Sequence, residues 1–174
     1  MRQAGVGGTE QVLDLLARHL CERGHEVTIV CRSREAAPHP AVRFVQLRRP
    51  VLGAAWRMRA FAEDVERHLA ESDYDVTLGL GKTWSQDVLR TGGGSHASYL
   101  EHARPHERRR LGDAWLKDRL ALGIERRAFQ PGAYRRVIAN SELVRRDVTA
   151  RYGVPPESIE VIHNGVDLAR FGPH

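Results

Sequence analysis

Residues 7–32, GGTEQVLDLLARHLCERGHEVTIVCR, decide the fold of this 174-residue chain. The stretch opens on Gly7, Gly8 and Thr9. Apolar residues then recur at helical spacing, and residues 26–31 (EVTIVC) have the β-branched composition of a strand. A glycine loop that leads into a helix leaves backbone N–H groups free at the positive end of the helix dipole. The loop therefore predicts a phosphate- or sugar-binding turn, and a plain tight turn between core elements is the alternative.

The composition is that of a globular protein with one folded domain. Apolar residues make up 41% of the chain and charged residues 28%, and the length suits one α/β domain rather than two. The net charge is +5, so phosphate-bearing small molecules, acidic lipid and nucleic acid are the candidate partners. No apolar run approaches the roughly 18 residues of a membrane span, and no signal segment follows Met1. Cys21 and Cys31 lack metal or disulfide spacing, which indicates core-facing thiols in a reducing cytosol and no metal site.

Strands and helices alternate along the rest of the chain. Strands are expected at residues 41–47, 75–80, 88–91, 134–139 and 159–162, and helices at 54–71, 104–129 and 142–152. This alternation predicts an α/β fold, a Rossmann-like parallel sheet with helices on both faces. A glycine loop of the kind at residue 7 normally follows a strand, and residues 1–6 contain none. We therefore expect the first strand of the sheet to be missing.

Glycine-rich loops follow two of the expected strands. A loop with Gly93, Gly94 and His96 follows the strand at 88–91, and Lys82 follows the strand at 75–80. Ligands in open parallel sheets bind at the carboxyl edge of the strands. His96 is therefore predicted to be catalytic, and Lys82, Gly93 and Gly94 are predicted to bind substrate or phosphate. A loop histidine with no catalytic role is the alternative.

A basic stretch begins at Arg104 and ends at Arg127, and it carries Trp115. An arginine-rich amphipathic helix with a tryptophan can lie on an anionic membrane surface. Acidic residues are interleaved with the arginines, which favours a solvated helix face instead. No recognition motif accompanies the charge, so nucleic acid is not expected as a partner.

The tail, residues 137–173 (VIANSELVRRDVTARYGVPPESIEVIHNGVDLARFGP), resembles the segment that ends the N-terminal domain of family 4 glycosyltransferases of the GT-B fold. In that family a strand leads to a serine-capped helix, a Tyr-Gly turn and a strand ending in Asn-Gly-Val-Asp. The loops at residues 7–10 and 92–96 are also similar to loops of the family. Residues 79–102 look most like the lipopolysaccharide-core glucosyltransferase type. The resemblance covers nearly all of the chain.

The resemblance implies one half of a GT-B fold. Residues 1–165 correspond to its N-terminal, acceptor-side domain, truncated at the start, and residues 166–174 to the start of the interdomain linker. The C-terminal nucleotide-sugar domain is expected to be absent, so the chain alone is expected to be inactive. The implied activity is the retaining transfer of a sugar from a nucleotide-sugar to a glycan or lipid-linked acceptor, with no metal or other cofactor.

The resemblance also implies roles for the loop residues. Gly7, Gly8 and Thr9 would approach the donor's phosphates or the reacting sugar, and His96 would contact the donor sugar. Preorganised N–H donors stabilise the negative charge that the leaving diphosphate gains in the transition state. The implied location is the cytoplasm, with contact at the inner face of the membrane through residues 104–127 as a further option.

Two alternatives of other classes stay open. Residues 5–10 begin like the G-x-G-x-x-G loop of an NADP-type Rossmann oxidoreductase. In such an enzyme, Arg32 and Arg34 could bind the 2′-phosphate of the cofactor. Against this, Glu10 stands where the third glycine belongs. In the second alternative the chain is a non-catalytic subunit that depends on a separate chain carrying the C-terminal domain, or a gene remnant.

Overall fold

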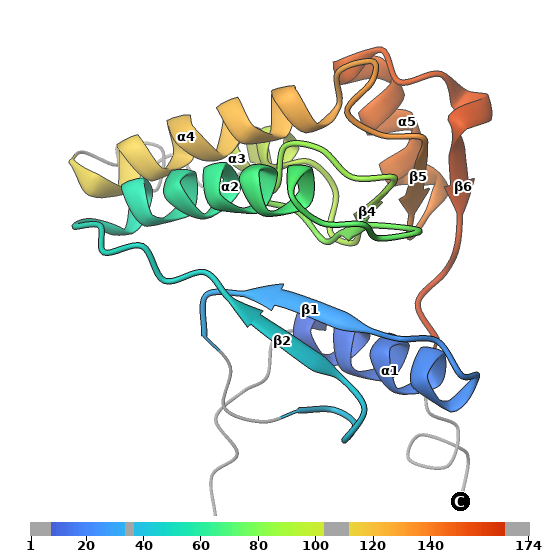
Figure 1. The fold of residues 1–174 in the computed structure, drawn as a ribbon. Helices are drawn as coiled ribbons and strands as arrows, with labels where there is room; N and C mark the ends of the chain where they lie inside the picture. Colours follow the sequence, from blue (N-terminus) through green and yellow to red (C-terminus); the bar gives the residue numbers. More distant parts are fainter. Residues whose placement is uncertain (1–7, 34–36, 103–111, 166–174) are drawn as a thin grey trace, which may run out of the picture.

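The computed structural model describes residues 8–33, 37–102 and 112–165 (Figure 1). The helices are α1 (Gly8–Glu22), α2 (Ala54–Ala70), α3 (His96–His102), α4 (Asp113–Ala128) and α5 (Glu142–Tyr152), with a 3-10 turn at Pro156–Ser158. The strands are β1 (Thr28–Cys31), β2 (Arg43–Gln46), β3 (Leu78–Gly79), β4 (Val88–Thr91), β5 (Arg136–Ala139) and β6 (Ile159–Val161). Every strand pair is parallel, which confirms the α/β, Rossmann-like class.

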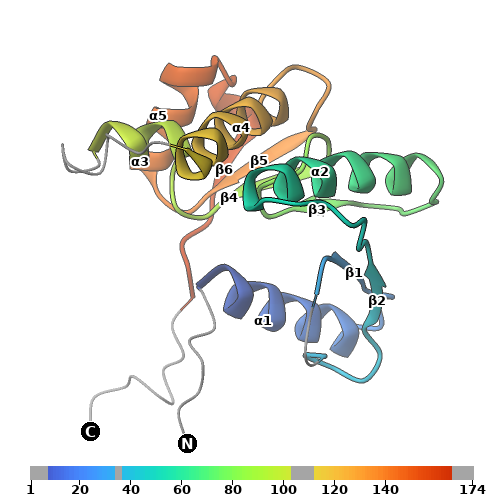
Figure 2. The ribbon, with the colours of Figure 1, turned by 90° about the vertical axis from the view of Figure 1, so that its left-hand side faces the viewer.

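The strands form two sheets, whereas the sequence analysis predicted one sheet lacking its first strand. β1 pairs with β2, and the larger sheet has the order β3-β4-β5-β6. α1 accompanies the smaller sheet, and the other helices accompany the larger one (Figure 2). Within the described ranges, β1 and β3 each have one edge without a strand partner, and β3 is the strand of the larger sheet that lies nearest to β1. The missing strand itself stays a prediction.

Each sheet has a hydrophobic core of its own. The larger core joins β4, β5 and β6 to α4 and α5, and its buried residues are Leu89, Ala128, Phe129, Val137, Ala139, Val144, Val148, Val154 and Ile159. The smaller core consists of Ala17, Ile29 and Val42. The side chains of Cys21 and Cys31 pack against this smaller core, in agreement with the sequence analysis. A two-stranded sheet with so small a core is marginally stable by itself.

The ends of α5 follow from local sequence. The Ser141 side chain accepts a hydrogen bond from the Val144 N–H at 3.3 Å, and so it satisfies one of the free donors of the first turn. Gly153 ends the helix with a φ of 67°, which is a left-handed conformation that glycine adopts without a steric penalty. Both helix ends were predicted at these positions.

Two predicted elements differ from the structure. The strand expected at residues 75–80 is reduced to β3, because the Asp87 carboxylate rather than a neighbouring strand accepts the Thr77 N–H. The helix expected at 104–129 is α4, which begins at residue 113, and residues 103–111 lie outside the described part of the chain. The short helix α3 was not predicted.

Asp87 ties the starts of β4 and β5 to the segment before β3. Its carboxylate accepts hydrogen bonds from the Thr77 N–H at 2.9 Å and the Thr77 hydroxyl at 2.7 Å, and it pairs with Arg135 at 3.2 Å. The bonds from Thr77, together with the charge of Arg135, hold the pKa of Asp87 below its ordinary value. A lowered folded-state pKa gives stability that is present above the unfolded value, about 3.9, and is lost as the pH falls through the folded value.

We expect Asp87→Asn to lower the free energy of unfolding at pH 7 by about 1–3 kcal/mol, because partly buried donors of Thr77 lose a charged acceptor. The variant should also lose the part of the acid destabilisation below about pH 4 that Asp87 causes. Urea unfolding at pH 7 and pH 3 measures both effects. Asp73→Asn is the matched control, since Asp73 is exposed. Equal behaviour of the two variants would contradict the role given to Asp87.

Candidate functional site

The glycine loop after β4 lies at the carboxyl edge of the larger sheet. Gly94 turns the chain with a φ of 80°, and Gly93 is exposed with open space where a Cβ would lie. The Asn140 side chain, which follows β5, donates to the Gly92 carbonyl at 2.7 Å. The loop is thereby fixed to the neighbouring strand while its backbone stays open to a ligand.

Ser95 fixes the start of α3 and with it the position of His96. It is 2% exposed, and its hydroxyl donates to Asp147 at 2.6 Å and accepts from the Ser98 N–H at 3.0 Å. A serine that accepts from the N–H three residues later is an N-cap. His96 is therefore the first residue of a helix that is anchored to α5.

The His96 imidazole is held by a carboxylate of α4. Its Nε2 lies 3.1 Å from Asp118 Oδ1, and its ring stacks on Tyr99 with centroids 5.8 Å apart. The side chains of His96 and Asp118 are 21% and 15% exposed, so the pair is largely shielded but reachable. An imidazole oriented in this way can exchange a proton with a ligand or bind a sugar hydroxyl.

A second carboxylate of α4, Glu125, holds the backbone at the same place. It accepts the His96 N–H at 2.6 Å and the Ala97 N–H at 3.3 Å, and it accepts the Tyr152 hydroxyl as well. Negative charge is favoured at the start of a helix. Burial, reinforced by the bond to Glu125, raises the pKa of Tyr152, which keeps its hydroxyl a neutral donor at physiological pH.

Lys82 extends into the same cluster. It is the one non-glycine residue with a positive φ, 67°, in the described part of the chain. Such a backbone conformation is uncommon for lysine and is often found at functional sites. Burial lowers the pKa of Lys82, and the charges of Glu125, Lys117 and Asp118 also act on it. Lys82 therefore lies within range of the charges of Asp118 and Glu125, the two carboxylates that bind His96, and its role in binding substrate or phosphate stays a prediction.

Two further predicted residues, Gly8 and Thr9, lie in the smaller lobe, which consists of α1, β1 and β2. Gly8 and Thr9 are exposed residues at the start of α1. Gly7 lies outside the described residues. Gly8 and Thr9 begin α1, whereas His96 begins α3, and the role of Gly8 and Thr9 in binding phosphate stays a prediction.

The sequence analysis missed Asp118 and Glu125 as site residues. It assigned the acidic residues of the basic stretch to a solvated face, and this is wrong for these two, which turn toward His96 and Tyr152. Their spacing of seven residues places them on one side of a helix, two turns apart. That spacing was the available signal.

Three comparisons with known proteins bear on this site. The model of glycosyltransferase family 4 matches residues 6–170. The chain belongs to this family. A probable transglycosylase of Burkholderia thailandensis is 27% identical over 177 residues, which is 96% of this chain and 44% of that relative. The crystal structure of WaaG, a glycosyltransferase involved in lipopolysaccharide biosynthesis, matches with a TM-score of 0.80 and 20% identity over 95% of this chain and 44% of that chain.

Membership of family 4 confirms the resemblance found in the tail and in the glycine loops. The likeness to WaaG confirms the Rossmann-like half of a GT-B fold. The chain spans less than half the length of both proteins. The oxidoreductase alternative is not favoured, because the match includes the tail that such an enzyme does not explain.

Proposed function

We propose that residues 1–165 are the acceptor-side domain of a glycosyltransferase that moves a sugar from a nucleotide-sugar to a glycan or lipid-linked acceptor. The observation that carries the proposal is the His96–Asp118 pair with Lys82 beside it, at the carboxyl edge of the sheet of a family 4 chain. Residues 166–174 begin the linker. A nucleotide-sugar domain completes the enzyme, and residues 1–165 are inactive without it.

The chemistry proposed for the site is retaining and metal-independent. The leaving diphosphate gains negative charge in the transition state, and cations or N–H donors that are already in place stabilise it. Lys82 supplies a cation, and the carboxylates of Asp118 and Glu125 act on its charge. Gly7, Gly8 and Thr9 supply backbone N–H groups from the other lobe, and His96 binds a hydroxyl of the transferred sugar.

A fused protein tests the proposal. Residues 1–165 are joined to the C-terminal part of the Burkholderia relative, and release of nucleoside diphosphate is measured over a panel of nucleotide-sugars and glycan acceptors. We expect turnover by the fused protein with a chelator present, none by the chain alone, and retained anomeric configuration by NMR. A folded fused protein that turns over no donor would contradict the proposal. Activity restored by mixing separate chains would support the partner-dependent subunit.

We also propose that this cytoplasmic protein touches the inner face of an anionic membrane. No helix in residues 8–33, 37–102 and 112–165 is long and apolar enough to cross a bilayer. Trp56 and Trp115 are exposed in the first turns of α2 and α4, which lie side by side and begin at the same end (Figure 1). Leu52, four residues before Trp56, is 92% exposed, and the Arg119 guanidinium lies 4.9 Å from the Trp115 ring centroid. Exposed tryptophans beside arginines suit a lipid interface.

We expect the double variant with Trp56→Ala and Trp115→Ala to lose most binding to vesicles of anionic phosphatidylglycerol in a co-sedimentation assay. At the opposite end of the basic stretch, the Arg127 guanidinium lies 4.1 Å over the Trp84 ring. Leu143→Ala removes an exposed apolar side chain from α5 and is the control. Undiminished binding of the double variant would refute the contact.

A further inference from the structure

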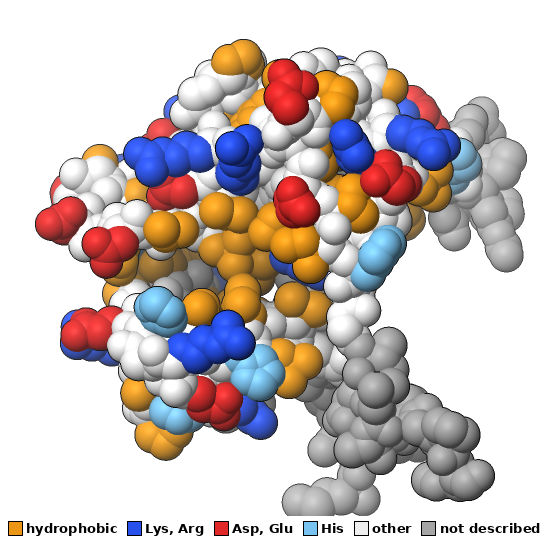
Figure 3. Space-filling view, turned by 90° about the vertical axis from the view of Figure 1, so that its right-hand side faces the viewer, with side chains coloured by type: hydrophobic (Ala, Val, Ile, Leu, Met, Phe, Trp, Pro, Cys, Tyr) orange, Lys and Arg blue, Asp and Glu red, His pale blue; other side chains and the backbone are white. Residues whose placement is uncertain are grey.

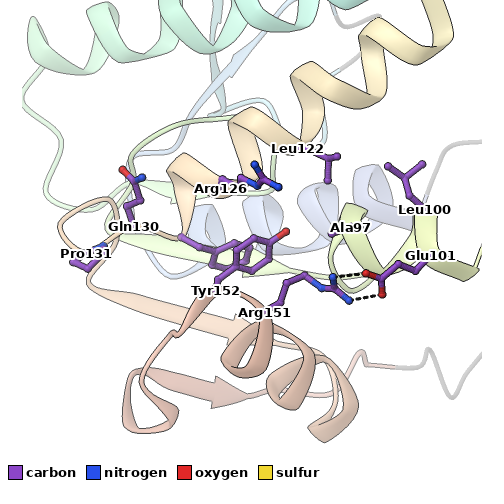
Figure 4. Close-up of a pocket in the computed structure, with 10 residues that line it drawn as sticks. Ala97, Leu100, Glu101, Leu122, Arg126, Gln130, Pro131, Arg151 and Tyr152 are labelled. Carbon is purple, nitrogen blue, oxygen red and sulfur yellow. Dashed lines mark hydrogen bonds and ion pairs between the residues drawn. The ribbon is translucent and has the colours of Figure 1, made fainter. Parts of the chain in front are cut away.

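An open groove lies between α3, α4 and α5, next to the His96 cluster (Figure 4). Its volume is about 780 Å³, within the range of known ligand sites. Each of the three helices contributes to its walls, and the turn after α4 closes one end. Neither the sequence analysis nor the proposed chemistry gives this groove a role.

The floor of the groove is aromatic. The rings of Phe129 and Tyr152 stack with centroids 4.7 Å apart, and Leu100 and Leu122 flank them. Phe129 belongs to the buried core, so Tyr152 is the ring that the core holds toward the groove. A fixed ring of this kind offers a flat apolar surface to a ligand.

The rim of the groove is polar and carries positively and negatively charged side chains. Arg151 donates to both carboxylate oxygens of Glu101 at 2.7 Å (Figure 4). Arg126 is exposed and forms no ion pair within the described part of the chain. The Gln130 amide, also exposed, provides both a donor and an acceptor.

These features distinguish between two kinds of occupant. An acyl chain in the groove would exclude water from Arg126 and from the Arg151–Glu101 pair. It would not replace the hydrogen bonds that water makes to these groups, so its binding would cost free energy. A sugar chain places C–H faces against an aromatic ring and offers hydroxyls to a rim with both donors and acceptors. An acidic substituent on that sugar would pair with the Arg126 guanidinium.

The groove borders the proposed active site. Ala97, which lines it, directly follows His96, and Tyr152 donates its hydroxyl to the same Glu125 carboxylate that accepts the His96 N–H. We propose that the groove binds the inner, acidic sugars of an acceptor glycan whose end reaches His96. This inference rests on the proposed function, because it assigns the groove to the acceptor.

Calorimetric titration of the 174-residue chain with an acidic trisaccharide, trigalacturonate, tests the inference, with neutral maltotriose for comparison. We expect trigalacturonate to bind at least tenfold more tightly than maltotriose, and Arg126→Ala to weaken its binding about tenfold. Arg146→Ala removes the same charge from an exposed position of α5 outside the groove and should have no effect. Ala97→Trp fills the groove and should abolish binding. Gln130→Ala gives a second test should the bulky variant fail to fold, and it should weaken binding measurably.

The inference is overturned when trigalacturonate does not bind, or binds the Arg126→Ala and wild-type chains equally. Sugar transfer plays no part in this titration. A fused protein that transfers sugar while the chain binds no trisaccharide would overturn the groove assignment alone. Trisaccharide binding that depends on Arg126, combined with a folded fused protein that turns over no donor, would overturn the proposed function alone.

Discussion

Replacing His96 by alanine in the fused protein is expected to lower kcat/KM about 100-fold or more, the loss usually seen when one preorganised transition-state contact is removed. The imidazole is fixed by Asp118 and by the capped start of α3, so its position costs no reorganisation during the reaction. Initial rates with saturating acceptor and varied donor measure the effect. His102→Ala is the control, since His102 lies exposed at the other end of α3.

A substitution of Asp118 tests the same role of His96 in a second way. Asp118→Asn keeps the size of the side chain and should cost about tenfold, because it acts through the orientation of His96. The double variant should then be no slower than His96→Ala alone, which is the sign of two residues that act as a unit. Additive losses, or a His96→Ala enzyme as fast as the His102→Ala control, would contradict the role given to His96.

A further parallel strand between β1 and β3 is expected to join the two lobes into one folding unit. Both strands have a free edge among the described residues, and Val76, shortly before β3, and Leu78, within β3, are exposed. Figure 3 shows hydrophobic side chains gathered in the hollow between the two lobes. Burying about three apolar side chains there stabilises by several kcal/mol before the cost of ordering the strand.

Hydrogen exchange measures this effect. Eight apolar, β-branched residues are placed directly before Met1, and a Gly-Ser segment of equal length is the control. Amides of α1, β1 and β2 should gain protection, tenfold for each ~1.4 kcal/mol by which the added strand raises the free energy of local opening. The control segment should change nothing. Unchanged protection with the apolar segment would contradict the proposed strand position.

The elements predicted correctly are those whose signals are local. Ser141 and Gly153 mark the ends of α5 in the sequence itself, and the short segment at residues 88–91, directly before the glycine loop, gives β4. The short α3 was missed because three glycines before it resemble a loop, although Ser95 is a recognisable N-cap. The two-sheet arrangement depends on pairing between distant segments, which composition and periodicity do not report.

The candidate site was predicted in part for the same reason. His96 and Lys82 follow expected strands and could be assigned to the carboxyl edge. Their neighbours on α4 are more than 20 positions away in sequence, and only the packing of α3 against α4 reveals that Asp118 faces His96. The positive φ of Lys82 is likewise a tertiary effect, since lysine has no intrinsic preference for that conformation.

The most direct measurement is the structure of the fused protein with a nucleotide-sugar bound. The proposed function predicts that the transferred sugar lies between the two domains, with a hydroxyl within hydrogen-bond distance of the His96 imidazole and the diphosphate near the Lys82 side chain. A donor bound with no contact from Lys82 or from the loop at residues 92–96 would contradict the assignment of this chain to the reacting face of a glycosyltransferase.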